Sequence, residues 1–298
     1  MTTDTAEAVA DFSTASSQAA LATEPPITFP KNSPLQRAWQ DIVAGTCNWP
    51  LWLMLAYQDI KLRYRRSVLG PFWITLSMAI TVYAMGFLYG HLFHIDLPHY
   101  YPFLVTGMLS WTLIQTIIIE ANDTFEMMSA TIKQVKLPYS LHIHRIVARN
   151  LIIFFHNILV IIPVMVIYHA TMPLNAYTLL VIPGLALIYI AGVIYGLILA
   201  MLGARYRDIS QMVKSLIQVI FFLTPVMWNP ATISGTHNME MLVYWNPFYS
   251  FLQMLRAPLL GQAPTLLNLM IVLGVMLVGA VASLCLLARY RARIIYWL

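Results

Sequence analysis

Six stretches of the chain are long enough and apolar enough to cross a lipid bilayer as helices. The hydrocarbon core of a bilayer is about 30 Å thick, so a spanning helix needs roughly 20 apolar residues. Only 10% of the 298 residues are charged, against about 25% in a typical soluble domain. The sequence therefore predicts an all-α membrane protein with six transmembrane helices, at about 72–93, 101–121, 146–168, 178–202, 211–228 and 265–288.

The positions of the basic residues predict how these spans are oriented. Lys and Arg concentrate in cytoplasmic loops. Sixteen of the 17 lie before the first span, in 122–149, in 203–214 or after the sixth span, so that Arg149 and Lys214 are at the cytoplasmic ends of spans three and five. We therefore expect both termini to be cytoplasmic.

The segment between spans five and six, 229–264, needs a separate interpretation because part of it is apolar enough to be mistaken for a span. It contains Glu240 and Arg256 and is broken at Asn246-Pro247, and a seventh span would move the C-terminal arginines outside. We predict a re-entrant or interfacial helical hairpin on the outer side. Non-helical backbone at that depth is tolerated where it packs in protein or lines a cavity, so a cavity is expected beside the hairpin.

The first 35 residues differ in composition from the rest. They are rich in Ala, Ser, Thr, Pro and acids, which predicts a disordered cytoplasmic tail, and 36–298 are then a single transmembrane domain. The net charge of +5 could suggest nucleic acid, but the cations flank apolar runs, so we expect membrane lipids and no nucleic acid as partners. Cys47 and Cys285 lack the spacing of metal ligands.

The sequence also indicates where energy for any transport would come from. The central parts of the spans contain no Asp, Glu, Lys or Arg, which argues against coupling to an ion gradient. The phosphate-binding motif G-x-x-x-x-G-K-[ST] is absent, so we expect no ATP site of that kind here. We predict no catalytic residue, no metal site and no cofactor on this chain, and a partner ATPase as the source of energy.

Two charged segments are predicted on the cytoplasmic face. Apolar residues at helical spacing predict an amphipathic interfacial helix at about 49–66 that ends before Gly70-Pro71, with Asp59 and Arg63 close enough to pair. The second span continues as "EANDTFEMMSATIKQVKLP". This continuation is either a solvated helix or a short helix that docks on a partner.

Four stretches resemble one family, the membrane subunits of ATP-binding-cassette exporters for polysaccharide, O-antigen and teichoic acid. They are "QDIKLRYRRSVLGPFW", "KLPYSLHIHR", "ARYRDISQMVKSLIQVIFFLTPVMW" and "NPFYSFLQMLRAPLLG". They occur in the family's order, and the resemblance extends from about residue 45 to the C-terminus. Gln58 stands where the family has Arg.

The resemblance implies a permease in the bacterial inner membrane that works in lipopolysaccharide or related glycan synthesis. Two copies would join two cytoplasmic ATPase subunits, which bind ATP and Mg²⁺, and a lipid-linked polysaccharide would cross between the copies. The charged segments would contact the ATPase through Asp59, Lys61, Arg63, Arg65, Arg66, Asp123, Glu126, Lys133 and Lys136.

Aromatic side chains are candidates for lining the glycan path, because sugar rings can slide over them without a fixed hydrogen-bond pattern. The candidates are Tyr83, Tyr89, Trp111, Tyr195, Phe222, Trp228, Tyr244, Trp245 and Tyr249. For each, the alternative is core packing or an interfacial belt.

Two other functions compete with glycan export. The first is an ATP-binding-cassette permease for another amphiphile, such as a drug or a lipid. The second is a membrane glycosyl- or phosphotransferase, which would need clustered acidic metal ligands. Asp41, Asp59, Asp123 and Asp208 are scattered, which counts against an enzyme.

Overall fold

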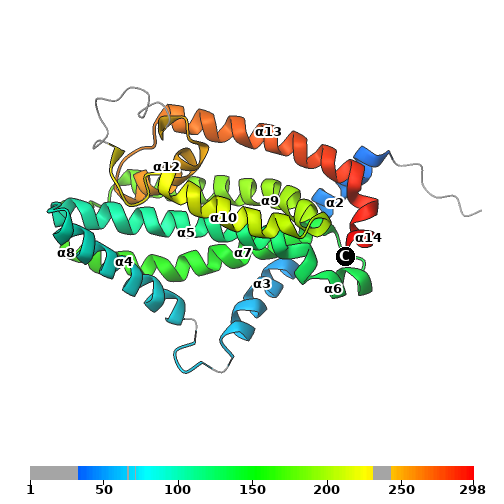
Figure 1. Cartoon of the computed structure of the whole chain (residues 1–298), viewed down its shortest axis with the longest axis horizontal. Coiled ribbons are helices and arrows are strands. Elements are labelled where there is room, and N and C mark those ends of the chain that lie inside the picture. The colour runs from blue at the N-terminus through cyan, green and yellow to red at the C-terminus, as the bar shows by residue number, and fades with distance from the viewer. Residues whose placement is uncertain (1–32, 66, 71, 231–242) are drawn as a thin grey trace, which may run out of the picture. The chain divides into compact units, whose positions relative to one another are not determined.

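The computed structural model describes residues 33–65, 67–70, 72–230 and 243–298, and within these ranges it contains helices and no strands (Figure 1). The helices from Pro34 to Leu298 belong to one unit. In chain order they are α2 (Pro34–Cys47), α3 (Trp49–Arg63), α4 (Phe72–Leu92), α5 (Leu97–Met127), α6 (Ser129–Gln134), α7 (Tyr139–Asn157), η1 (Ile158–Val160), α8 (Ile161–Ile167), η2 (Ala176–Leu180), α9 (Val181–Arg205), α10 (Asp208–Leu223), α12 (Pro247–Leu259), α13 (Leu266–Tyr290), η4 (Arg291–Arg293) and α14 (Ile294–Trp297).

Five helical segments in the described residues are long and apolar enough to cross a membrane. They are 72–92, 97–127, 139–167, 176–205 and 266–297. Each contains most of a predicted span, and four are longer than predicted because the helix continues past the apolar stretch into charged sequence. The prediction of a multi-pass, all-helical membrane protein is confirmed at this level.

The fifth predicted span, 211–228, corresponds to α10, which is shorter. α10 has 16 residues, or about 24 Å at 1.5 Å per residue. It ends at Leu223 because Pro225 disfavours helical backbone at the preceding residue, and Thr224 is extended. The predicted end at 228 is therefore wrong by five residues, and the count of six spans stays a prediction.

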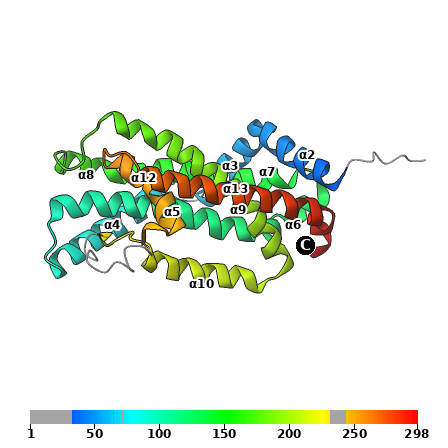
Figure 2. The same cartoon turned by 90° about the horizontal axis from the view of Figure 1, so that it is seen from above.

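Helix α5 is the centre of the packing. Two-thirds (67%) of its most apolar window is buried, against 11% for α4. It contacts α4, α7, α9, α10 and α12, and Figure 2 shows α10 along one edge of the bundle. α5 is thus placed to connect the other helices.

The first and last helices of the unit lie at the same end. Figure 1 shows α2, α6 and α14 gathered there, with α8 and the turn between α4 and α5 at the other end. We call these the α2 end and the α8 end. Arg291, just after α13, donates from Nε to Asp41 Oδ2 of α2 at 3.0 Å. An even number of crossings would give this arrangement.

A helix, α3, lies where the interfacial helix is predicted, but the side chains that it buries differ from those expected. Ala56 and Ile60 are buried, but Trp49 and Leu53 are 58% and 40% exposed. Asp59, expected on the polar side, is turned inward. The predicted division into an apolar and a charged face is therefore not what the structure shows, since α3 makes its main polar contacts on the side that packs on α7.

Two other predictions concern the ends of this region. Residues 1–32 of the predicted tail, 1–35, are outside the described residues. The last two residues of that range, Pro34 and Leu35, belong to α2. In the predicted hairpin, 231–242 are outside the described residues. The break at Asn246-Pro247 is a helix start, because Asn246 Oδ1 accepts from the Phe248 N–H at 2.9 Å and caps α12.

Candidate functional site

A largely buried ion pair joins α3 to α7. Arg145 donates to Asp59 with both sides of its fork, from Nε to Oδ2 at 2.9 Å and from Nη2 to Oδ1 at 2.5 Å. Arg149 Nη1 donates to the same Oδ2 at 3.3 Å. Arg145 and Arg149 are four residues apart, so they lie on one face of α7. The side chains of Asp59 and Arg149 are only 12% and 6% exposed.

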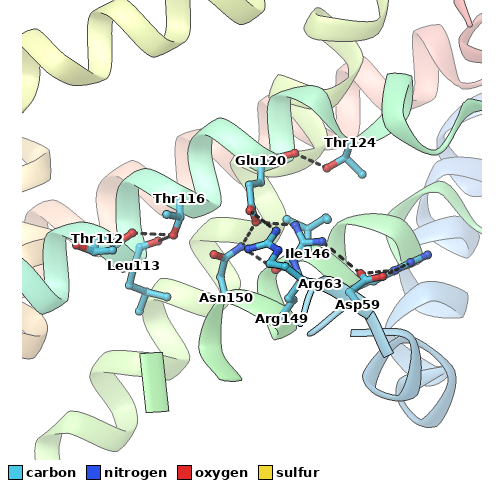
Figure 3. A network of polar contacts seen from close by, with 11 residues as sticks. Asp59, Arg63, Thr112, Leu113, Thr116, Glu120, Thr124, Ile146, Arg149 and Asn150 are labelled. Atoms are coloured by element: carbon cyan, nitrogen blue, oxygen red, sulfur yellow. Dashed lines mark hydrogen bonds and ion pairs between the residues drawn. The ribbon is translucent and has the colours of Figure 1, made fainter. Parts of the chain in front are cut away.

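Arg149 extends this pair to α5, as Figure 3 shows. Its Nη2 donates to Glu120 Oε2 at 2.7 Å, and Asn150 Nδ2 donates to the same oxygen at 2.6 Å. Arg63, near the end of α3, approaches Glu120 Oε1 at 3.5 Å. Arg149 therefore bridges two carboxylates on different helices. We call Asp59, Arg63, Glu120, Arg145 and Arg149 the α3–α5–α7 ion network.

The network lies where the apolar part of α5 ends. Glu120 is 23 residues after Leu97, about 35 Å along the helix axis, which is just beyond the roughly 30 Å of a hydrocarbon core. Ionised groups are tolerated there because water is near. The three-helix junction therefore joins α3 to α5 and α7 just past the apolar part of α5.

A second junction ties α5 to α10. Asp123 Oδ2 pairs with Lys214 Nζ at 3.0 Å, and its Oδ1 accepts from Ser210 Oγ at 2.6 Å. Asp123 is therefore occupied by partners within the chain.

A third junction fixes the start of α7. The Asp41 carboxylate accepts from the backbone N–H groups of Tyr139 at 3.2 Å and Ser140 at 3.1 Å. These are the first two residues of α7, whose N–H groups have no partner inside the helix. A carboxylate is favourable at a helix N-terminus. Asp41 thus joins α2, α7 and, through Arg291, the end of α13.

The predicted ATPase contacts divide into two groups. Asp59 and Asp123 point into the junctions above, and Arg63 is part of the ion network while its side chain stays 46% exposed. The others that the structure describes are on the surface; they are Lys61, Arg65, Glu126, Lys133 and Lys136. Arg66 lies outside the described residues. The predicted pair of Asp59 with Arg63 is replaced by Asp59 with Arg145 and Arg149.

The predicted glycan-path aromatics do not form one cluster. Trp111 is buried and packs on Phe221 and Phe248, with ring centroids 5.7 and 6.2 Å away. Tyr249 is buried beside Tyr244. Of the rest, Phe222, Tyr244 and Trp245 are exposed, and Trp228 Nε1 donates to the Phe222 carbonyl at 3.2 Å.

The other three aromatics lie elsewhere. On α4, Tyr83 donates its hydroxyl to the Val160 carbonyl at 2.7 Å, and Tyr89 stacks on Phe93. Tyr195 on α9 donates to the Val275 carbonyl at 2.8 Å. For Tyr83 and Tyr195, packing between helices explains the side chain as it stands.

A cavity of about 360 Å³ lies against α12, where one was expected. Its walls come from α5, α9, α12 and α13, and include Ile117, Tyr195, Phe248, Phe251 and Val275. Among the described residues, those lining it carry no charge. In the same part of the chain, no group of three or more His, Cys, Asp or Glu is placed to hold a metal ion.

Comparison with known proteins identifies the family. The family model described as "ABC-2 type transporter" matches residues 50–260. The chain belongs to the ABC-2 type transporter family. In this ABC-2 chain the match includes the whole α3–α5–α7 ion network and α12, while Asp41 and Arg291 lie outside it. The family resemblance drawn from the motifs is thus confirmed.

The ABC-2 chain is also similar to curated relatives. It is 24% identical to the O-antigen export system permease protein RfbA of Klebsiella pneumoniae over 206 residues, which cover 68% of this chain and 77% of that protein. It is 23% identical over 202 residues to the protein of the same name from Myxococcus xanthus, with the same coverage.

Three residues of the network, Glu120, Arg145 and Arg149, were not among the predicted site residues, whereas Asp59 and Arg63 were. The available signal was the four-residue spacing of Arg145 and Arg149, which places them on one face of a helix. Asp59, which pairs with both, is 86 residues from Arg145 and 90 from Arg149 in the sequence. The pairing could therefore not be predicted from local spacing.

Proposed function

We propose that this chain is the transmembrane subunit of an ATP-binding-cassette exporter that carries a lipid-linked polysaccharide, such as O-antigen or capsule, across the bacterial inner membrane. The observation that carries the proposal is the similarity to O-antigen export permeases over two-thirds of the chain. The chain itself is not an enzyme in this proposal. ATP and Mg²⁺ bind to a partner ATPase.

The working complex would contain two copies of this chain and two ATPase subunits. The exposed charges at the end of α3 and around α6 are the contacts that we assign to the ATPase: Lys61, Arg65, Glu126, Lys133 and Lys136. Two of these residues, Lys133 and Lys136, lie at or just after α6, a short helix that follows the long helix α5. A short exposed helix at the end of a long one suits docking on a partner.

The ion network supports a route for motion from the ATPase to the membrane. α5 is one helix of 31 residues, from the α8 end to the exposed Glu126. Because Glu120 and Asp59 share Arg149, a displacement of α5 at its exposed end carries α3 and α7 with it. Such rigid-body shifts of packed helices are a common way to transmit a change.

The exposed aromatics support a path for sugar rings. Phe222, Tyr244 and Trp245 are each 43% or more exposed. Aromatic faces offer large contact area without a fixed hydrogen-bond geometry, which suits a polymer that must slide. In the assembled pair these side chains would face the polymer, while Trp111 and Tyr249 hold the helices beneath them.

Deleting the gene tests this proposal in cells. We expect lipid-linked glycan to accumulate inside the cell while its synthesis continues, and surface glycan to be lost, with both restored by a plasmid copy of the chain. Normal surface glycan in the deletion strain would contradict glycan export. It would favour a permease for another amphiphile, which the same strain would reveal as a change in lipid distribution or drug sensitivity.

A further inference from the structure

Arg256 of α12 is a buried cation at membrane depth. It is 1% exposed. It contacts α5 at Phe103 and Gly107, six and ten residues after that helix begins, or about 9 to 15 Å along the axis. Arginine at such depth is costly and therefore marks a site with a function until shown otherwise.

The guanidinium holds two consecutive carbonyls just after α10 ends. Nη1 donates to the Pro225 carbonyl and Nη2 to the Val226 carbonyl, each at 2.6 Å. These carbonyls lie outside both α10 and α12 and so have no partner within a helix. Buried backbone carbonyls need a hydrogen-bond partner. The planar fork of Arg can satisfy both at once, which the single ammonium of Lys does less well.

The surroundings on α5 are shaped to admit this fork. The Phe103 ring lies under the guanidinium carbon, 4.0 Å from the ring centroid. A Cβ on Gly107 would lie 1.9 Å from Arg256 Nη2 and 2.5 Å from the Val226 carbonyl oxygen. Glycine at 107 is therefore required for Arg256 to reach 225–226 beside α5.

A second side chain of α12 holds the same turn. Asn246, which caps the start of α12, donates from Nδ2 to Thr224 Oγ1 at 3.1 Å. Residues 224–226 are thus bound at two places on α12, by its N-cap Asn246 and by Arg256 near its C-terminal end.

The partners of Arg256 are neutral. Within the described residues it forms no ion pair with a carboxylate, and its Nε has no hydrogen-bond partner. Removing one member of a buried ion pair strands the other charge at high cost. Withdrawing Arg256 strands two uncharged carbonyls, which costs less, so this contact can be released more easily than the α3–α5–α7 ion network.

We propose that Arg256 is a positioning residue that works as a releasable latch, closing the turn 224–226 against α5 until transport opens it. The role in transport rests on the proposed export function; the latch itself does not. The latch controls how α10 meets α12, and so the place of Trp228 and Tyr244, which flank these contacts in sequence.

A buried cysteine at 226 reports whether the latch is closed. Val226 is fully buried, so Val226→Cys is made in the full chain with Cys47 and Cys285 replaced by Ser. The complex with its ATPase is kept in membranes, and the rate of reaction with N-ethylmaleimide is measured. We expect Arg256→Met and Gly107→Ala each to raise the rate at least about tenfold, because reaction at a buried thiol requires local opening.

Three comparisons make the result specific. Arg256→Lys keeps the charge and one hydrogen bond and should give an intermediate rate. Arg207→Met, at an exposed arginine, and Gly274→Ala, where a Cβ meets nothing within 4 Å, should leave the rate unchanged. If Arg256→Met fails to accumulate, Gly107→Ala still opens the latch with Arg256 present. Unchanged rates in both accumulated variants would overturn the latch.

Export separates the latch from its role in transport. With the latch open, we expect the complex to continue hydrolysing ATP while glycan exported per ATP falls. Faster labelling with normal export per ATP would overturn the role in transport. Because labelling requires no glycan, it supports or overturns the latch even where the chain exports no glycan, so the two failures are distinguishable.

Discussion

Arg149 is the residue on which the α3–α5–α7 ion network depends most, because it alone contacts carboxylates on both α3 and α5 among the described residues. Its side chain is 6% exposed. The two carboxylates need it for different reasons. Asp59 also has Arg145, whereas Glu120 has the neutral Asn150 and, as its other cation among the described residues, the more distant Arg63 at 3.5 Å.

Replacing Arg149 with Met should therefore destabilise the protein. We expect a loss below the roughly 3–5 kcal/mol of a fully buried pair in the free energy of unfolding, because Glu120 and Asp59 lose positive charge while keeping some contact with water. Denaturation of the purified protein in detergent measures this, with Arg207→Met as the matched surface control. Equal stability of the two variants would contradict the role given to Arg149.

Asp41 accepts hydrogen bonds from the start of α7 and also pairs with Arg291, and the effect of its removal on the α7 start can be measured separately. Asp41→Ala should cost about 1–2 kcal/mol, the range for losing a helix cap, and should speed amide hydrogen exchange at Tyr139 and Ser140. Asp41→Asn keeps an acceptor oxygen and should have a smaller effect. Slow exchange at both amides in Asp41→Ala would show that the carboxylate does not cap α7.

Sequence could predict which charges exist at this level but not which way they point. The only pairing visible for Asp59 was with Arg63, four residues on, since local spacing is all that a single sequence contains. The actual partner depends on how α3 packs on α7. The same limit applies to Arg256, which was predicted within the hairpin of 229–264 without any partner being assigned and is buried against α5.

At the scale of the elements, α5 and α6 carry exposed charges that the proposed function assigns to the ATPase contact. α5 is continuous through its apolar and charged parts, and Glu126 and Lys133 are exposed on either side of the turn between α5 and α6. Charge changes at these two positions should leave the fold intact, because neither side chain is in a junction described above.

Reversing either charge should uncouple the ATPase from transport. For Glu126→Lys or Lys133→Glu we expect ATP hydrolysis to continue while glycan export falls about tenfold, the effect of losing roughly 1.4 kcal/mol of contact energy. Lys133→Arg keeps the charge and should export normally. Full export by both reversed variants would remove these residues from the contact.

The length of the apolar stretches made the presence of the long helices predictable. The residues at which the helices end were less predictable. The five long helices contain the predicted spans because bilayer thickness sets a minimum apolar length. The end of α10 was misplaced although Pro225 was visible, because hydropathy continues across it through Val226, Met227 and Trp228. Local backbone chemistry decided the end, and composition did not show it.

For the whole unit, the meeting of α2 with the end of α13 sets the topology. Arg291 and Asp41 can pair only if the chain returns to the side on which Pro34 lies. The basic residues predict that this shared side is cytoplasmic. A reporter that is active only on the non-cytoplasmic side should then be inactive when fused after Leu298 and active when inserted near Ile95. Activity after Leu298 would contradict the predicted cytoplasmic C-terminus.

Transport by sealed, inside-out membrane vesicles tests the central claim most directly. In such vesicles the cytoplasmic face is outward, and lipid-linked glycan made there can be digested by an added glycan-cleaving enzyme unless it has been carried into the lumen. We predict that ATP protects the glycan in vesicles containing this chain and its ATPase. The protection should be absent in vesicles from the deletion strain. Equal protection in both kinds of vesicle would contradict export by this chain.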